Sequence, residues 1–109
     1  MGVERVVKKA GTGPTPQRGQ KVTVHCTGIL TATNKKFWST KDTNEPFSFN
    51  VGLGQVIKGW DEGVMQMNVG ESSDLVMTGD FAYGAKGFPA WGIPPNAGLT
   101  FEIDLISAQ

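Results

Sequence analysis

The stretch Val56-Ile57-Lys58-Gly59-Trp60-Asp61-Glu62-Gly63-Val64-Met65-Gln66-Met67 decides the fold. At helical spacing its apolar residues share one face and its charged residues the other: Ile57, Trp60, Val64 and Met67 against Lys58, Asp61 and Glu62. This pattern predicts one short amphipathic helix over 56–67. Gly59 and Gly63 each disfavour a helix by about 1 kcal/mol relative to alanine, but their spacing leaves one side without side chains. We therefore expect the helix to lie in the hollow of a curved sheet, with a buried Trp60 at the floor of that hollow.

Length, charge and cysteine content limit the class of protein. The 109 residues suit one domain over 1–109, which we expect to be monomeric. Ten basic and ten acidic residues cancel without forming a block of like charge, so we expect neither a nucleic acid nor a membrane surface as a partner. Residues 1–5 are not a signal-like apolar run, and one cysteine cannot form an internal disulfide. These features predict a cytoplasmic protein.

Alternating apolar and polar residues indicate that the rest of the chain is mostly β-strand. The clearest alternation covers 21–30 and 99–106. Shorter β-like runs are 3–9, Phe37-Trp38, 47–51 and 75–77. Strands outnumber helices and no parallel βαβ unit is visible. The pattern predicts an α+β domain in which an antiparallel sheet of about five strands folds over one short helix.

One long irregular region, 79–98, carries an unusual number of aromatic and aliphatic side chains. These are Phe81, Tyr83, Phe88, Trp91 and Ile93, set among prolines and glycines. A loop of this length in a small domain is more often functional than connecting. We therefore expect part of this region to contribute to a site.

Several kinds of catalytic site are disfavoured. His25 and Cys26 are adjacent on a predicted strand, so their side chains point to opposite faces and cannot act as a nucleophile and base. One His and one Cys also fall short of a metal site. Gly52-Leu53-Gly54 lacks the third glycine of a dinucleotide fingerprint and indicates a tight turn. Asp61 and Glu62 are interpreted as surface charges. We expect no metal and no cofactor.

A group of apolar residues remains, and it has two interpretations. Its members are Phe37, Trp38, Phe47, Val56, Ile57, Trp60, Tyr83, Phe88, Ile93 and Phe101. They are either the core of a small domain or, in part, the lining of an apolar cleft. Tryptophan and tyrosine carry donors that need partners, and several of these residues lie in loops or at strand ends. A cleft of this kind would bind a ligand and remove it from water.

Four motifs together resemble those of the FKBP family of peptidyl-prolyl isomerases. They are Val24-His25-Cys26-Thr27-Gly28, Val56-Ile57-Lys58-Gly59-Trp60-Asp61-Glu62-Gly63, Asp80-Phe81-Ala82-Tyr83-Gly84 and Ile93-Pro94-Pro95. The similarity covers nearly the whole chain in order. Two further segments, 36–42 and 87–93, resemble the small single-domain members from plants.

The resemblance implies a fold and a set of residue roles. The fold is an antiparallel half-barrel wrapped on the helix, with the ligand held between sheet and helix. Trp60 is the implied floor, and the implied walls are Phe37, Phe47, Val56, Ile57 and Phe101. Phe88 and Ile93 are implied to join the site from the long loop, and the Ile57 N–H and Tyr83 hydroxyl are the implied donors to ligand carbonyls. Catalysis would rest on Phe37, Ile57, Trp60, Tyr83 and Phe101, with proline-containing peptides as substrates.

Two positions depart from the family pattern. Cys26 and Trp38 stand where members usually carry a tyrosine and an aspartate that line the ligand site. The resemblance implies binding of macrolide drugs such as tacrolimus and rapamycin, and these two changes are expected to weaken it. No second cysteine is available near 75–78 for a redox disulfide.

Three hypotheses therefore stay open. The preferred one is a peptidyl-prolyl cis-trans isomerase. The second is a binding module for proline-like or macrolide ligands with little turnover. The third adds a drug-dependent kinase or phosphatase partner that would contact the loops 41–45 and 84–91.

Overall fold

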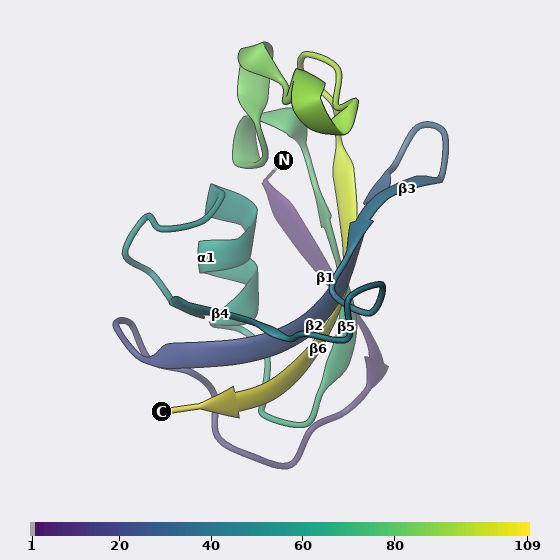
Figure 1. Cartoon of the computed structure of the whole chain (residues 1–109). Coiled ribbons are helices and arrows are strands. Elements are labelled where there is room, and N and C mark those ends of the chain that lie inside the picture. The colour runs from purple at the N-terminus through teal and green to yellow at the C-terminus, as the bar shows by residue number, and fades with distance from the viewer. Residues whose placement is uncertain (1) are drawn as a thin grey trace.

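The computed structural model describes residues 2–109 and consists of one curved sheet and one helix (Figure 1). In chain order the elements are β1 Val3–Lys9, β2 Lys21–Leu30, β3 Lys35–Ser39, β4 Phe47–Asn50, α1 Lys58–Val64, β5 Ser72–Met77 and β6 Leu99–Ala108. Three short 3-10 turns lie between β5 and β6: η1 Gly79–Phe81, η2 Gly84–Lys86 and η3 Pro89–Trp91. No helix within these residues is long and apolar enough to cross a membrane.

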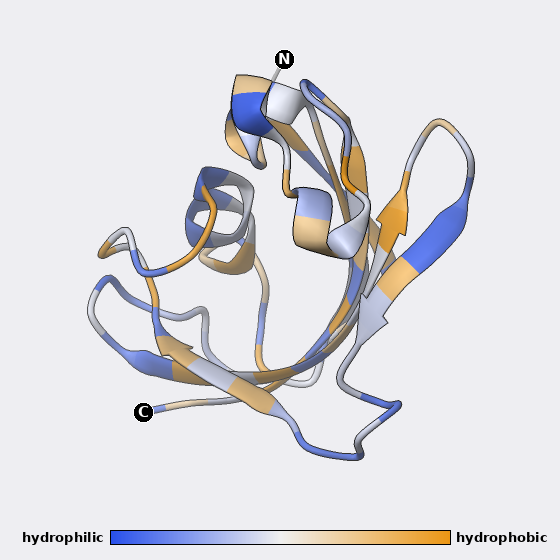
Figure 2. Cartoon of the chain, turned by 45° about the horizontal axis from the view of Figure 1, so that its top comes forward, coloured by the Kyte–Doolittle hydropathy of each residue, from blue (hydrophilic) through white to orange (hydrophobic). Residues whose placement is uncertain are grey.

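The sheet is antiparallel, with the strand order β1-β5-β6-β2-β3 and β4 paired to β2 beside that path. The predicted antiparallel sheet of about five strands over one helix is confirmed, and the sheet has 6 strands, of which β4 lies beside the five-strand path. β3 and β4 both pair with β2, β3 along Thr27–Leu30 and β4 along Lys21–Val24. They occupy one edge in succession, and the mostly hydrophilic loop 40–46 separates them (Figure 2).

The helix is shorter than the predicted 56–67 at both ends. Ile57 is extended, with φ −60° and ψ 152°, and its carbonyl accepts the first hydrogen bonds, from the N–H groups of Trp60 and Asp61. After Val64 the N–H groups of Gln66 and Met67 bond to carbonyls three residues back, at Gly63 and Val64. The last turn is thus tightened to 3-10 geometry, as is common where a helix ends.

The helix lies in the hollow of the curved sheet, as predicted from its glycines (Figure 1). A Cβ added to Gly59 would lie 2.4 Å from Met77 Sδ, and one added to Gly63 would lie 2.6 Å from Leu75 Cδ1. Both partners belong to β5 and are buried. The two glycines therefore permit the close packing that offsets their poor helix propensity.

The core fills the space between helix and sheet. Alternate residues of β2 and β6 point inward, including Val22, Val24 and Cys26 from β2 and Phe101 and Ile103 from β6, all at most 2% exposed. The predicted alternation of these two strands is therefore correct. The helix contributes Trp60 and Val64 to the same cluster.

Candidate functional site

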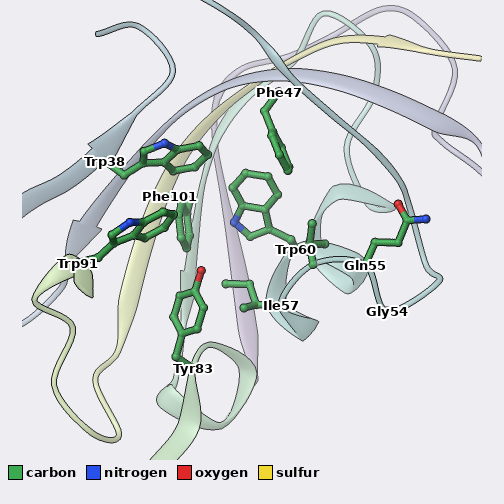
Figure 3. Close-up of a pocket in the computed structure, with 10 residues that line it drawn as sticks. Trp38, Phe47, Gly54, Gln55, Ile57, Trp60, Tyr83, Trp91 and Phe101 are labelled. Atoms are coloured by element: carbon green, nitrogen blue, oxygen red, sulfur yellow. The ribbon is translucent and has the colours of Figure 1, made fainter. Parts of the chain in front are cut away.

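An apolar cavity of about 410 Å³ opens between the helix and the sheet (Figure 3). It is lined by Trp38, Phe47, Gly54, Gln55, Val56, Ile57, Trp60, Tyr83, Trp91 and Phe101. The volume falls in the range of small-molecule sites, and none of these side chains is charged at neutral pH. The cavity therefore suits a neutral, largely apolar ligand.

Trp60 forms the base of the cavity and is 3% exposed. Its ring makes edge-to-face contacts with Phe101, with centroids 5.1 Å apart at 89°, and with Phe47, at 5.7 Å and 76°. Its Nε1 is the one buried side-chain nitrogen or oxygen within residues 2–109 that has no hydrogen-bond partner. The edge-to-face packing fixes the indole, which gives the cavity a rigid floor.

Two hydrogen-bond donors stand at the edge of this apolar surface. The Ile57 N–H donates to no backbone carbonyl among residues 2–109, because it lies just before the first turn of α1. The Tyr83 hydroxyl points into the space between Trp91 and Trp60 (Figure 3). Burial raises the pKa of the Tyr83 hydroxyl, so the group stays protonated and able to donate at neutral pH.

Trp38 and Trp91 close one side of the cavity as a stacked pair. Their centroids are 5.6 Å apart with an interplanar angle of 15°. Trp38 comes from β3 and also lies 6.1 Å from the Trp60 ring, whereas Trp91 comes from η3 and is 39% exposed. The Trp38 indole therefore lines the cavity and narrows it.

Comparisons with known proteins agree with this architecture. Residues 13–106 match the family described as FKBP-type peptidyl-prolyl cis-trans isomerase. This chain belongs to that family. It is 58% identical to peptidyl-prolyl cis-trans isomerase FKBP12 of Vicia faba over the whole of both chains, and 57% identical to the protein of the same name of Arabidopsis thaliana, again over the whole of both. It is 53% identical to FK506-binding protein 1 of Dictyostelium discoideum, covering 98% of each chain.

A solved structure supports the same assignment. The crystal structure of AtFKBP13 superposes with a TM-score of 0.91 at 32% identity, covering 98% of this chain and 93% of that one. The FKBP fold, an open sheet that wraps one helix, is therefore confirmed. The family-level function predicted from the motifs, a peptidyl-prolyl cis-trans isomerase, is confirmed as well.

Seven of the residues predicted for an FKBP-type site reach the cavity surface. They are Trp38, Phe47, Val56, Ile57, Trp60, Tyr83 and Phe101. Four others, Cys26, Phe37, Phe88 and Ile93, are not part of that lining. The contribution of the seven to binding and catalysis remains a prediction.

The four remaining residues lie behind the lining and support it. Phe37 packs edge-to-face on Phe101 at 5.8 Å, and Phe88 stacks on Tyr83 at 5.2 Å. Ile93 is 2% exposed and forms a β-bridge with Phe88 that closes the turn carrying Trp91. Cys26 is fully buried in the core. Cys26 and Ile93 belong to the core cluster, whereas Phe37 and Phe88 are partly buried and pack against it. A part of these four in ligand binding remains a prediction.

The sequence reasoning missed three lining residues and one residue that positions them. Trp91, Gly54 and Gln55 reach the cavity, and loop residues of this kind carry no periodicity that indicates where they point. The Asp61 carboxylate accepts hydrogen bonds from the N–H groups of Gly52 and Gly54, each at 2.9 Å. Beyond the surface charge predicted for it, Asp61 therefore ties the turn before the helix to the helix itself.

His25 and Cys26 form no nucleophilic pair in this family member. The His25 Nδ1 lies 2.9 Å from the hydroxyl of Thr40, whereas Cys26 points into the core. Burial raises the pKa of the Cys26 thiol to about 12, so it remains a neutral thiol. The two side chains therefore lie on opposite faces of β2, as the strand alternation predicts.

Proposed function

We propose that this chain accelerates rotation about X-Pro bonds in proteins and peptides through the cavity above Trp60. The observation that carries the proposal is a neutral, mostly apolar cavity with donors at its edge, the Ile57 N–H and the Tyr83 hydroxyl. Membership of the isomerase family gives independent support. A role in protein folding follows from such an activity, because X-Pro isomerisation is slow enough to limit folding.

The chemistry needs no nucleophile and no metal. Rotation about the X-Pro bond passes through a twisted state in which amide resonance is lost, with an uncatalysed barrier of about 18–20 kcal/mol. The planar amide is more charge-separated than the twisted one, so removal from water disfavours the planar form relative to the twisted form. A rate gain of about 10⁶ requires about 8 kcal/mol of such differential stabilisation.

Each residue of the cavity has a distinct part in this proposal. Trp60, Phe47 and Phe101 would hold the pyrrolidine ring and exclude water. The Ile57 N–H would fix a substrate carbonyl, and the Tyr83 hydroxyl would orient the carbonyl of the twisting amide. The side chains and the donors are anchored to α1, β4 and β6 or to the turn after β5, so little reorganisation would accompany the reaction.

Exchange spectroscopy on an apolar-Pro peptide tests the proposal. The wild-type protein at micromolar concentration should accelerate the exchange of cis and trans signals. Phe101→Ala should reduce the acceleration most, because it removes a wall, and Tyr83→Phe should reduce it by about tenfold, the equivalent of one hydrogen bond. Ile106→Ala, which truncates an exposed side chain on the outer face of β6, is the matched control. No acceleration by the wild type would refute the isomerase proposal.

We also propose that macrolides bind in the same cavity, with weakened affinity. Relatives named FK506-binding protein support macrolide binding, and FK506 is tacrolimus. Trp38 occupies cavity space and offers no carboxylate, which supports the weakening. Trp38→Asp should raise affinity for tacrolimus and rapamycin, and Cys26→Tyr less, because Cys26 is behind the lining. Titration calorimetry measures both changes, and unchanged affinity in Trp38→Asp would contradict this account.

The second candidate is a binding module with little turnover, and the inward position of Trp38 is the observation that favours it. That candidate predicts ligand-dependent tryptophan fluorescence together with near-background exchange rates.

A drug-dependent kinase or phosphatase partner would contact the loops 41–45 and 84–91. We further propose a monomeric, single-domain protein of the cytoplasm, which the balanced charge and the buried free Cys26 support.

A further inference from the structure

The loop 10–20 between β1 and β2 contains a hydroxyl residue directly before a proline. Of the 6 prolines in the chain, only Pro16 follows a serine or threonine, and that residue is Thr15. Arg18 stands three residues after Thr15. Proline-directed serine/threonine kinases select this pattern, a hydroxyl residue followed by proline, with a basic residue two positions further on. A motif of this kind acquires meaning only where its structural context fits the chemistry.

The structure leaves the Thr15 side chain open to an enzyme. Residues 10–17 belong to no helix or strand, and Thr15, Gln17 and Arg18 are exposed. Neither the N–H nor the carbonyl of Thr15 takes part in a backbone hydrogen bond within residues 2–109. The loop runs along the end of the molecule opposite the three 3-10 turns (Figure 1). An enzyme can therefore reach Thr15 without displacing a strand.

A kinase must also reach Pro16, which is buried. The Pro16 carbonyl accepts no backbone hydrogen bond among the described residues, and Arg18 holds the loop through an exposed bond from its Nε to the Gly52 carbonyl, at 3.2 Å. Lifting segment 15–18 off the surface breaks side-chain hydrogen bonds and uncovers one proline, but it keeps every strand pairing. Local openings of this kind cost far less free energy than global unfolding.

The charges around Thr15 suit a phosphate group. No acidic residue stands between Glu4 and Asp42 in the sequence, whereas Arg18 lies in the loop itself. Asn68 Nδ2 donates to the Thr15 hydroxyl at 3.1 Å, so an amide donor already faces the oxygen that would be esterified. A phosphate adds about −1.5 to −2 charges at pH 7, and an arginine and an amide are suitable partners for it.

The carboxylate bonded to Asn68 has a cation of its own. Glu71 accepts a hydrogen bond from the Asn68 N–H and is paired with Arg5 at 3.1 Å. The Glu71 side chain is 3% exposed, whereas Thr15 lies on the surface. The Arg5 pairing therefore reduces the repulsion that Glu71 would exert on a phosphate at Thr15.

We propose that Thr15 is a phosphorylation site for a proline-directed serine/threonine kinase. The Thr15 Oγ attacks the γ-phosphorus of magnesium-bound ATP, the bond from that phosphorus to the β–γ bridging oxygen breaks, and ADP leaves. The hydroxyl proton passes to a base of the kinase. Thr15 lies outside the cavity lining, so this site goes beyond the proposed isomerase function and does not depend on it.

Incubation of the folded full chain with MgATP and a cyclin-dependent or a mitogen-activated kinase, in separate reactions, tests the proposal. Intact mass measures phosphate per chain, and fragmentation mass spectrometry locates it. The wild type should gain a phosphate on Thr15, Thr15→Val should gain none there, and Pro16→Ala should lose most of the phosphorylation. With the cyclin-dependent kinase, Arg18→Ala should slow it by about three- to tenfold, the equivalent of one charge-assisted contact.

Thr12→Val is the matched control, because Thr12 is an exposed threonine of the same loop that precedes glycine. It should be phosphorylated at the wild-type rate. In the phosphorylated wild type, the NMR signals of the Asn68 side-chain amide and the Arg18 Nε–H should shift, because both groups lie in or against the loop.

No phosphate on the folded wild type with either kinase overturns the proposal. Equal incorporation in Thr15→Val, or incorporation only into urea-unfolded protein, overturns it as well. Superposable circular dichroism spectra of the variants exclude misfolding as the cause of a lost phosphate. Exchange rates of an apolar-Pro peptide are measured separately, so absence of isomerase activity would refute the proposed function and leave the Thr15 site standing.

Discussion

The base and the rim of the cavity are built in opposite ways. At the base, Trp60 is 3% exposed and sits on a helix whose glycines lie against β5. At the rim, Trp91 is 39% exposed and sits on a three-residue 3-10 turn that one β-bridge closes. Both carry an indole that faces the same ligand space, yet only the first belongs to the core.

The difference separates residues that hold the cavity together from residues that only line its mouth. Changes at the base disturb the packing of helix on sheet, so they alter stability and function together. Changes at the rim alter the ligand surface and leave the core intact. The lining of the rim can therefore be changed at low cost in stability.

Replacing each of the two tryptophans by alanine is the most direct test of this difference. Trp60→Ala should lower the free energy of unfolding by about 3–5 kcal/mol, because it empties a packed position. Trp91→Ala should lower it by less than about 1 kcal/mol, because the side chain is partly exposed on a turn. Urea denaturation of both variants measures the contrast. Similar losses would show that the rim belongs to the cooperative core.

A single methyl group tests how tightly the base is packed. Gly63→Ala improves helix propensity by about 1 kcal/mol, but its Cβ would lie 2.6 Å from the Cδ1 of the fully buried Leu75. We expect a net loss of about 1–2 kcal/mol in the free energy of unfolding. Glu62→Ala, at the exposed neighbouring position, should change it by less than about 0.5 kcal/mol. A more stable Gly63→Ala protein would contradict the close packing.

The tether between the helix and the preceding turn lies at the boundary of base and rim. Asp61→Ala removes the acceptor of the Gly52 and Gly54 N–H groups and should cost about 1 kcal/mol. Hydrogen exchange should accelerate at Gly52 and Gly54, and Asp61→Asn should have an intermediate effect because it keeps one acceptor oxygen. Equal protection of these amides in Asp61→Ala and wild type would remove the role we assign to Asp61.

The smallest effect is expected from pH. Tyr83 is the one ionisable side chain in the lining, and burial raises its pKa above the ordinary value. A raised pKa keeps the neutral, donating form populated below about pH 10, so exchange rates should be flat from about pH 6 to about pH 9 and fall only in stronger base. A bell-shaped profile centred near neutrality would indicate a general acid or base that the cavity does not contain.

Features that depend on periodicity could be predicted from the sequence. The helix, its buried Trp60 and the inward faces of β2 and β6 follow from spacing alone, because each buries a repeated apolar set. The alternation of β2 also places Cys26 on the inward face, and Cys26 is fully buried.

Features that depend on tertiary contacts could not be predicted from the sequence. The helix begins at Lys58 because Ile57 is extended, and it stops at Val64 because the last turn tightens. The spacing of apolar residues indicates neither boundary. The hydrogen bonds of Asp61 could not be predicted, because they depend on how the turn at 52–54 folds back on the helix. The inward position of Trp91 depends on a bridge between Phe88 and Ile93 in a region without any repeat.

The shared edge of β2 has a consequence for how such a protein can diversify. β3 and β4 hydrogen-bond to separate halves of β2, and Thr40 extends the first pairing by bonding to the Cys26 backbone, so the part of the connection that carries no register is 41–46. Residues can be inserted or deleted there without shifting either pairing. Lineages can thus remodel this segment, and with it the neighbourhood of Trp38, while inheriting an unaltered scaffold.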